Sequence, residues 1–319
     1  MAHLVEQMAY VGRTPWHGLG NQLTEQQPLE VWMRQAGLDW NIKESPVRFI
    51  NGDKGHLGEI LSFDEQKVLY RSDTRAPLSV VSQRYQVVQP REVLEFYRDL
   101  TEKSGFELET AGSLKGGRKI WALAKTGQSG VIKGNDRTDA YVLLATACDG
   151  TMATTAQFTS VRVVCNNTLA VALNGRAQSV KVSHRSVFEP EAVKHQMGIS
   201  VSAWDEFMYG LKTLSERKVK QPEVEMFMRS LFQPSPEQVE KKANERAMGK
   251  VLAMFEGEGR GSNLASSAGT AYGLLNAVTE FVDHERQARS TDNRLDSAWF
   301  GQGAALKQQA LEQAIALAA

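Results

Sequence analysis

Short apolar runs separated by turn-forming residues dominate the first half of the chain. Between Pro46 and Arg71 these runs are interrupted at Asn51-Gly52 and again at Asp64-Glu65, a pattern typical of β-hairpins. The strand-like composition continues from there up to Pro90. This part of the chain is therefore predicted to form antiparallel strands.

The apolar side chains of residues 91–104 recur instead at helical spacing, and Gly105 suits the end of a helix. Strand-like runs then resume, with a turn at Gly116-Gly117 between the first two. They cover residues 106–114, 119–126, 138–150 and 151–164. The stretch that begins at about Cys165 fits either a helix or a further strand.

From about Glu189 onward the apolar positions follow steps of three and four residues, which predicts a series of helices. Two of these helices begin near Pro222 and near Ser235-Pro236, and the Ala- and Gln-rich tail forms another. Strands with one interposed helix, followed by helices, indicate an α+β fold. We expect an antiparallel β-sheet with a packed helix, followed by a helical C-terminal region. The predicted parts are an N-terminal segment with a short helix, an α+β core and the helical region, at residues 1–45, 46–188 and 189–319.

Charge is balanced over the 319 residues, with 37 Lys and Arg against 37 Asp and Glu. Its distribution is uneven, because residues 112–220 hold 15 basic and 8 acidic side chains, and residues 150–188 hold no acidic one. Local positive charge attracts a phosphate backbone whatever the total charge of the protein. The alternative is that acidic side chains elsewhere balance these bases in space.

Composition and motifs disfavour several classes of protein. Two cysteines, Cys148 and Cys165, are too few for a disulfide scaffold or a four-cysteine zinc site. No apolar run approaches the ~18 residues of a membrane span and no signal-peptide core is present, so a cytoplasmic location without membrane contact is expected. The chain has no metal-binding histidine spacing and no phosphate-loop, dinucleotide-binding or nucleophile-elbow motif. A non-enzymatic role without cofactor or metal is favoured.

Asp283-His284-Glu285 is a compact acid–base cluster in a predicted helix. Adjacent helical residues diverge by about 100°, so these three side chains do not converge on one ion without help. A solvated helix face is the favoured interpretation. A nuclease or hydrolase of unfamiliar type that uses the cluster stays a third hypothesis.

A basic and an aromatic side chain are predicted to share one strand face at Lys119 and Trp121, which are two residues apart. Single-stranded nucleic acid uses this combination, because bases stack on the ring and phosphates bind the cation. Further basic residues in a strand and in a polar connector are expected to contact phosphates rather than bases. The full candidate set is Arg118, Lys119, Trp121, Arg162, Arg176, Lys181 and Arg185. The alternative is that Trp121 is buried under helix 91–104, with Lys119 at the end of its strand, and that the connector is a solvated loop.

Four motifs resemble those of one protein family. They are TPWHGLG near the N-terminus, FTSVRVVCNNTLAVAL in the middle, and TAYGLLNAVTEFVDHER and SAWFGQGAALKQQAL toward the C-terminus. In these motifs the chain resembles the phage- and plasmid-encoded proteins of the domain-of-unknown-function 932 family. The resemblance implies a setting in mobile elements, often near DNA-processing genes, but no established reaction.

The order of elements over residues 84–126 is similar to the core of the single-strand annealing proteins. Those proteins pack a helix across a bent β-hairpin sheet, assemble into rings or filaments, and hold DNA in a basic groove. The resemblance implies a non-enzymatic protein that binds and anneals single-stranded DNA in recombination as a homo-oligomer, with a partner exonuclease or a host protein as further candidate partners. The alternative function is a protein-interaction or regulatory module of a mobile element, for example one directed against a host defence.

Overall fold

The computed structural model divides the chain into two compact units, each of which is described by itself. Unit 1 comprises Met1–Thr126, Val142–Gln157 and Ser179–Gly198, and unit 2 comprises Gly127–Tyr141, Phe158–Gln178 and Ile199–Ala319. The structure describes residues 5–12, 20–52, 58–162, 167–170, 172–173, 176–177, 179–197, 201–232 and 244–319.

The larger sheet has the strand order β10-β9-β8-β7-β6-β1-β2, and β13 also pairs with β9. β1 and β2 are parallel, whereas β1 with β6, β6 with β7, and β9 with both β10 and β13 are antiparallel. The strands are β1 (Val5–Val11), β2 (Asn21–Leu23), β6 (Glu107–Leu114), β7 (Lys119–Val131), β8 (Arg137–Ala147), β9 (Thr154–Arg162), β10 (Asn167–Ala170) and β13 (Ser179–Val182).

Strand pairing decides the secondary structure after Cys165 and assigns the N-terminal segment. The described residues after Cys165 are strands rather than a helix: β10, then the short pair β11 (Ala172–Leu173) and β12 (Arg176–Ala177). β1 and β2 pair within the larger sheet, so the N-terminal segment belongs to unit 1.

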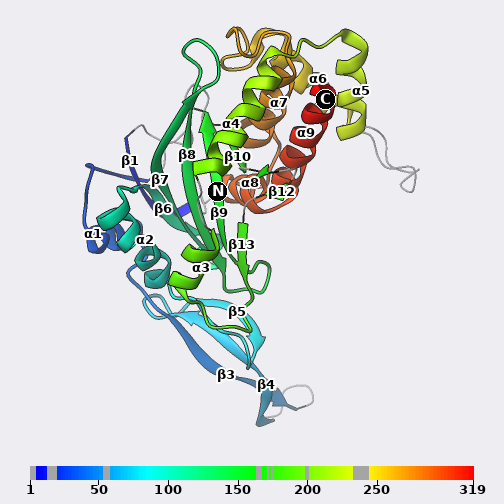
Figure 1. Cartoon of the computed structure of the whole chain (residues 1–319). Coiled ribbons are helices and arrows are strands. Elements are labelled where there is room, and N and C mark those ends of the chain that lie inside the picture. The colour runs from blue at the N-terminus through cyan, green and yellow to red at the C-terminus, as the bar shows by residue number, and fades with distance from the viewer. Residues whose placement is uncertain are drawn as a thin grey trace. The chain divides into compact units, whose positions relative to one another are not determined.

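Unit 1 also contains a separate three-stranded sheet formed by β3 (Ile42–Asn51), β4 (Glu59–Arg71) and β5 (Pro77–Ser82), in that order. Figure 1 shows β3 and β4 as a long hairpin. Gln89 fixes the base of this hairpin, because its side-chain amide bonds both backbone groups of Ile42: Oε1 accepts from the amide at 2.8 Å and Nε2 donates to the carbonyl at 3.1 Å.

The helix that follows, α2 (Pro90–Ser104), has local start and stop signals. Pro90 occupies the first turn, where its missing N–H costs nothing, and the amide of Gln89 donates to Glu92 Oε2 at 2.6 Å. Gly105 ends the helix with φ 69°, a left-handed conformation that glycine adopts without a steric cost. A shorter helix, α1 (Leu29–Gln35), contacts α2.

Tyr97 joins α2 to the larger sheet within unit 1. Its fully buried hydroxyl donates to the carbonyl of Ala122 on β7 at 2.8 Å, lies 3.1 Å from the carbonyl of Val142, and accepts from the amide of Leu144 on β8 at 2.8 Å. Burial also raises the pKa of this phenol well above its usual value, so the hydroxyl stays a donor.

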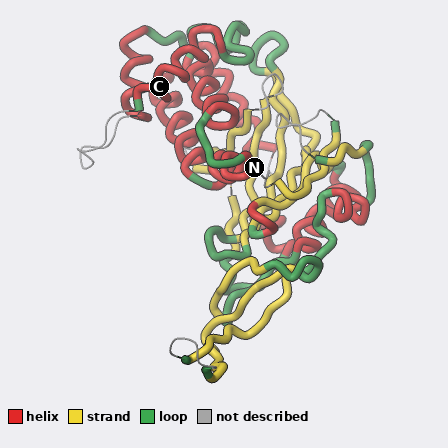
Figure 2. Tube along the Cα trace, turned by 180° about the vertical axis from the view of Figure 1, so that it is seen from behind, coloured by secondary structure: helices red, strands yellow, loops and turns green. Residues whose placement is uncertain are grey.

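Unit 2 is mainly helical in its C-terminal part. α7, buried along its whole length, contacts α4, α6 and α9, and α9 also contacts α4, α5 and α8. Figure 2 shows these helices in red and the strands in yellow. The helices of unit 2 are α4 (Val201–Glu216), α5 (Gln221–Phe232), α6 (Glu245–Ala253), α7 (Ala271–Glu280), α8 (Thr291–Phe300) and α9 (Gln302–Ala318), and α3 (Pro190–Met197) belongs to unit 1.

The fold is α+β, as the order of strands and helices predicted. The compact units do not follow the expected boundaries at residues 46–188 and 189–319, because β7, β8 and β9 each contribute residues to both units. The helix expected to begin near Ser235-Pro236 lies outside the described residues. No helix in the described part of the chain has both the length and the apolar character needed to cross a bilayer.

We expect Tyr97→Phe to lower the free energy of unfolding by about 1–3 kcal/mol, because the buried amide of Leu144 loses its acceptor. Urea titration of both proteins measures this difference. Tyr209→Phe, at an exposed position on α4, is the control and should leave stability unchanged. An equal stability of the Tyr97 and Tyr209 variants would contradict this role for Tyr97.

Candidate nucleic-acid interface

Lys119 and Trp121 do not form the exposed pair that was expected. The exposed fractions are 6% for Lys119 and 2% for Trp121, and every residue of β7 from Lys119 to Ala124 is buried. Both faces of the strand are therefore covered in unit 1. Neither side chain offers a stacking surface, and this part of the expected interface is corrected.

Three of the other expected bases are exposed. Arg118 is exposed after the turn Lys115–Gly117, and its carbonyl accepts from the amide of Cys148 at 2.8 Å. Lys181 is exposed on β13 opposite Thr155, and Arg185 is exposed in the turn that follows. All three belong to unit 1.

Arg162 ends β9 and Arg176 opens β12, and both belong to unit 2. Their side chains lie outside the described part of the structure. Within unit 1, Arg118 and Arg185 border the same loop of residues 148–153, since His184 lies 3.1 Å from the carbonyl of Met152 through Nε2.

The acid–base cluster at Asp283 to Glu285 does not converge on one point. It forms a π-helical turn, Phe281–Glu285, after α7. Asp283 is buried and binds Lys307 Nζ of α9 at 2.8 Å through Oδ1. Its Oδ2 accepts from the amide and hydroxyl of Thr168 at 2.7 and 3.1 Å.

Glu285 instead forms an ion pair with Lys250 of α6 at 3.0 Å. Asp283 and Glu285 thus have separate partners on different helices. Lys307 also donates to the carbonyl and hydroxyl of Thr168, both at 2.8 Å. These contacts hold β10, the π-helical turn and α9 together, which is a structural role for Asp283.

A different sheet surface combines aromatic rings with exposed cations. We call it the outward face: the side of β3, β4 and β5 opposite the buried residues Leu69, Lys67 and Val81. Alternation along the strands and the register assign its members. The paired positions are Lys43 with Tyr70, Ser45 with Val68, Val47 with Phe63, Phe49 with Leu61, and Val68 with Val80.

A hollow of about 580 Å³ lies on the outward face. It is lined by residues with no carboxylate among them: Lys43, Ser45, Val68, Tyr70, Ser72, Arg75 and Pro77. Lys43 and Arg75 are exposed, and neither forms an ion pair with a described residue. The hollow therefore presents positive charge beside an aromatic ring.

The carboxylates nearest in sequence are held by other cations. Glu44 binds the buried Lys67 at 2.7 Å, and Asp73 binds the buried Arg71 at 2.7 Å. The hydrogen bond from Arg71 lowers the pKa of Asp73 to about 2. Arg71 also lies over the ring of Trp40, 4.3 Å from its centroid.

Two more aromatic rings extend the outward face beyond the hollow. The exposed fractions are 42% for Phe63 and 48% for Phe49. On β3, Lys43 lies opposite Tyr70, Val47 lies opposite Phe63, and Phe49 is itself a ring position. At a rise of about 3.3 Å per residue, these three positions are roughly 13 and 7 Å apart. Among the described residues of this face, Glu59 at the far end is the one carboxylate that the register assigns to it, whereas Asp64 and Glu65 lie in an irregular stretch of β4.

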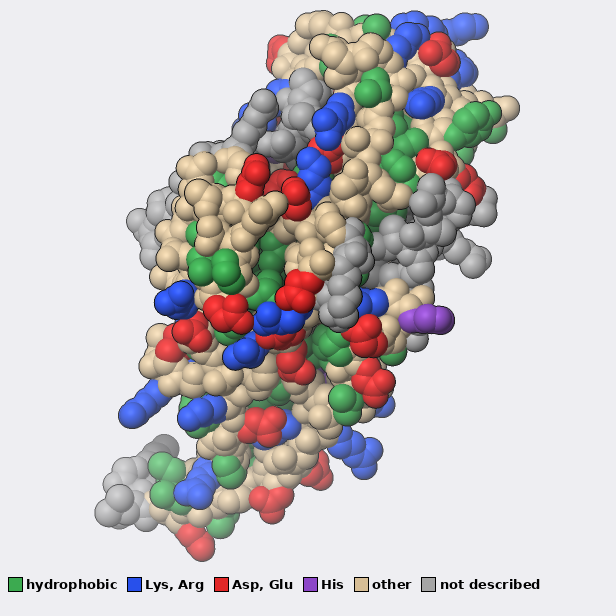
Figure 3. Space-filling model, turned by 60° about the vertical axis from the view of Figure 1, so that its left-hand side comes forward, with side chains coloured by type: hydrophobic (Ala, Val, Ile, Leu, Met, Phe, Trp, Pro, Cys, Tyr) green, Lys and Arg blue, Asp and Glu red, His purple; other side chains and the backbone are tan. Residues whose placement is uncertain are grey.

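Figure 3 shows basic and acidic side chains interspersed over the visible face, with hydrophobic ones reaching the surface at its lower end, where β3 and β4 lie in Figure 1. The feature that distinguishes the outward face is therefore the local combination of rings and cations rather than a large basic patch.

Sequence reasoning missed this surface, although one signal was present. Lys43, Ser45, Val47 and Phe49 alternate with other residues at the period of a strand, so they share one side. The pairing of Lys43 with Tyr70 joins residues far apart in the chain and is specified only by the register.

The comparison with protein families matches residues 77–299 to the family model "Domain of unknown function (DUF932)". The chain belongs to this family. No curated protein and no solved structure matched the chain, so the expected likeness to the single-strand annealing proteins has no support from these comparisons. The described residues of this family member contain no cluster of three or more His, Cys, Asp or Glu side chains that could hold a metal ion.

We expect Lys307→Ala to destabilise the protein by about 3–5 kcal/mol, because Asp283 would be left as an uncompensated buried charge. Thermal and urea unfolding measure the loss. The matched control is Lys212→Ala at an exposed position of α4, which should have little effect. If the Lys307 variant were as stable as the Lys212 variant, the structural role of this ion pair would be refuted.

Proposed function

We propose that this protein binds single-stranded DNA without catalysing a reaction, and that the outward face of β3, β4 and β5 is the binding surface. The observation that supports it best is the combination of Tyr70, Phe63 and Phe49 with Lys43 and Arg75, two cations that form no ion pair with a described residue. A single strand exposes both its bases and its phosphates, and this surface has a partner for each.

In this proposal, the stacking of bases on the aromatic rings provides binding that does not depend on the DNA sequence. Each base that stacks on an aromatic side chain contributes about 1–3 kcal/mol, and every base has a face to offer. Lys43 lies directly opposite Tyr70, so a phosphate bound by the amine is close to a base stacked on the ring. The exposed bases Arg118, Lys181 and Arg185 of unit 1 are further candidates for phosphate contacts.

Strand annealing is the activity that we propose for this binding. Annealing requires only that one strand be held extended while a complementary strand pairs with its bases, so it needs no metal or nucleophile. The mobile-element setting implied by the motifs is consistent with a role in recombination. Membership of a family of unknown function neither favours nor opposes this activity.

Tyr70→Ala should weaken binding of a single-stranded oligonucleotide by about 1–3 kcal/mol, or roughly 5- to 150-fold in dissociation constant. Lys43→Ala should reduce the slope of log affinity against log salt by about 0.7, the contribution of one phosphate contact. Fluorescence anisotropy at several salt concentrations measures both quantities.

The matched control is Tyr209→Ala, which removes a tyrosine that is 73% exposed on α4 of unit 2. Its affinity for DNA should equal that of the unaltered protein. No binding of single strands at low salt, or an equal loss in the Tyr70 and Tyr209 variants, would eliminate the outward face as the binding surface.

A second candidate function, a protein-interaction module, is favoured by the opposite side of the same hairpin. Ile50 and Ile60 form a cross-strand pair there and are 69% and 64% exposed. Among the described residues, β5 pairs with the part of β4 from Gln66 to Tyr70, and no described strand pairs with either edge of the outer part of the hairpin. Free edges and exposed apolar pairs are surfaces on which protein chains associate. A second copy of this chain is the partner that we propose.

Ile60→Glu should convert a homo-oligomer to a smaller species, because the glutamate opposite Ile50 would place a negative charge in the apolar contact between the two copies. Light scattering with and without DNA measures the change, and Ile315→Glu on the exposed side of α9 is the control. If the unaltered protein is a monomer under both conditions, this second function is wrong, whatever its affinity for DNA.

A further inference from the structure

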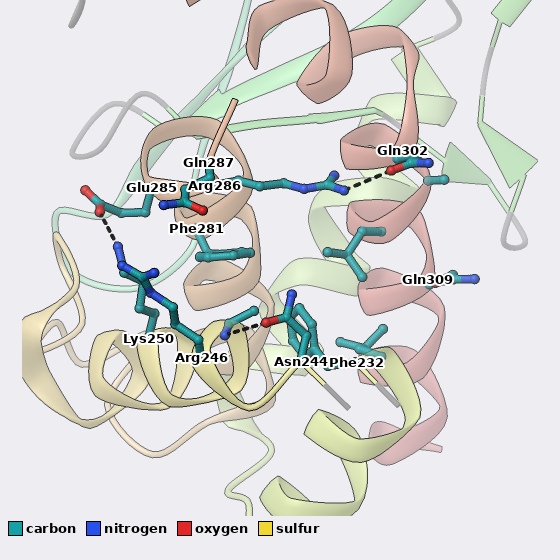
Figure 4. A pocket seen from close by; sticks show the side chains of 14 residues that line it. Phe232, Asn244, Arg246, Lys250, Phe281, Glu285, Arg286, Gln287, Gln302 and Gln309 are labelled. Atoms are coloured by element: carbon teal, nitrogen blue, oxygen red, sulfur yellow. Dashed lines mark hydrogen bonds and ion pairs between the residues drawn. The ribbon is translucent and has the colours of Figure 1, made fainter. Parts of the chain in front are cut away.

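A cavity of about 620 Å³ lies in unit 2 among α5, α6, the π-helical turn and α9. This volume is within the usual range of small-molecule sites, about 300–1,000 Å³. It is separate from the outward face, which belongs to unit 1. Figure 4 shows its side chains from close by.

Two phenylalanine rings form the apolar part of the cavity. Phe232, at the end of α5, and Phe281, at the start of the π-helical turn, meet edge to face with ring centroids 6.1 Å apart and an angle of 83° between their planes. Leu231 and Leu306 add aliphatic surface beside them. Such a wall suits a flat aromatic group.

The π-helical turn also carries a cation, Arg286, whose side chain extends into the cavity. The amide of Arg286 donates to the carbonyl of Phe281, five residues earlier, at 2.7 Å. Figure 4 shows the Arg286 side chain running across the cavity above Phe281 toward Gln302. Its guanidinium donates to Gln302 Oε1 at 3.1 Å and to Ser297 Oγ at 3.4 Å, which are both neutral acceptors.

Among the described residues that line the cavity, the cations Arg246, Lys250 and Arg286 outnumber the single carboxylate, Glu285. Glu285 is paired with Lys250, whereas Arg246 is exposed and forms no ion pair with a described residue. Arg286 is partly buried, and this burial lowers the pKa of its guanidinium. Arginine binds phosphate through two parallel N–H groups, and an anion would compensate the charge that burial makes costly.

We propose that this cavity binds a nucleoside 5′-phosphate, either free or at the end of a DNA strand, with the phosphate on Arg286 and Arg246 and the base against Phe232 and Phe281. Gln302 lines the same cavity, and its side-chain Nε2 supplies a donor for the edge of a base while its Oε1 accepts from Arg286. The aromatic ring, the phosphate and the base edge of a nucleotide thus each have a partner in this cavity. The proposal is independent of the proposed function, because it concerns unit 2.

Isothermal titration calorimetry with the full chain tests this site. The probes are the four nucleoside 5′-monophosphates, adenosine, inorganic phosphate, and a 5′-phosphorylated dinucleotide with its unphosphorylated counterpart. We expect one monophosphate or the phosphorylated dinucleotide to bind at one site per chain. Adenosine, the unphosphorylated dinucleotide and inorganic phosphate should each bind at least about tenfold more weakly, since each lacks one of the two recognised groups.

Arg286→Gln removes the charge but keeps a side chain that can bond Gln302, and it should weaken that binding by about tenfold or more. Arg289→Gln is the matched control, because Arg289 is exposed nearby in the chain and does not line the cavity. Phe281→Leu keeps an apolar side chain but removes the ring, so it should also weaken binding. Thermal melting followed by circular dichroism checks that each variant is folded.

Several results would overturn the proposal. They are the absence of binding by every phosphorylated probe, binding of inorganic phosphate as tight as that of the best nucleotide, and an equal loss in the Arg286 and Arg289 variants. Preferential binding of the free monophosphate or of the strand end identifies the source of the ligand. DNA affinity of the Tyr70 variant is measured separately, so failure of either proposal leaves the other intact.

Discussion

The buried ion pair between Lys307 and Asp283 organises the helical part of unit 2. Two charges removed from water are stable only when each has enough partners, and here Thr168 supplies the remaining ones. Asp283 points inward to this cluster while Glu285 points to Lys250, because residues two apart in a helical turn lie on opposite sides of it. The same turn brings the backbone amide of Arg286 to the carbonyl of Phe281. The ion pair therefore fixes α9 against the π-helical turn, and both of these elements contribute side chains to the neighbouring cavity.

In unit 1 the corresponding constraint is the difference in burial and charge between the two sides of the sheet β3, β4 and β5. The inner side contains cations that must be neutralised because they are buried, and Glu44 and Asp73 neutralise Lys67 and Arg71. Those carboxylates are then not available to Lys43 and Arg75. The outward face stays positive although the complete chain has no net charge.

The local signals in the sequence predicted the elements well. Pro90 and Gly105 mark the ends of α2 within one residue of the expected 91–104, and the order of strands and helices predicted the α+β class. The burial of Trp121 was also indicated, because Ile120 to Ala124 is a continuous apolar run, which is typical of a strand covered on both faces.

What the sequence could not specify is which distant residues meet. Lys43 reaches Tyr70 only through the register of β3 and β4, and Phe232 meets Phe281 only through the packing of unit 2. The stretch after Cys165 lacked a clear period, so its described strands were decided by pairing with neighbours rather than by local preference. Both candidate sites depend on contacts between residues far apart in the chain. A local pattern of hydrophobic and polar residues does not specify such contacts.

Arg75 shows what the outward face costs the protein. Its backbone has φ 59°, a left-handed conformation that disfavours any residue with a Cβ by about 1–2 kcal/mol and that glycine adopts freely. A glycine would close this turn with less strain but would leave no cation beside the hollow. The turn thus exchanges folding stability for surface chemistry, and an engineer who optimises this protein for heat resistance alone would be led to replace the residue.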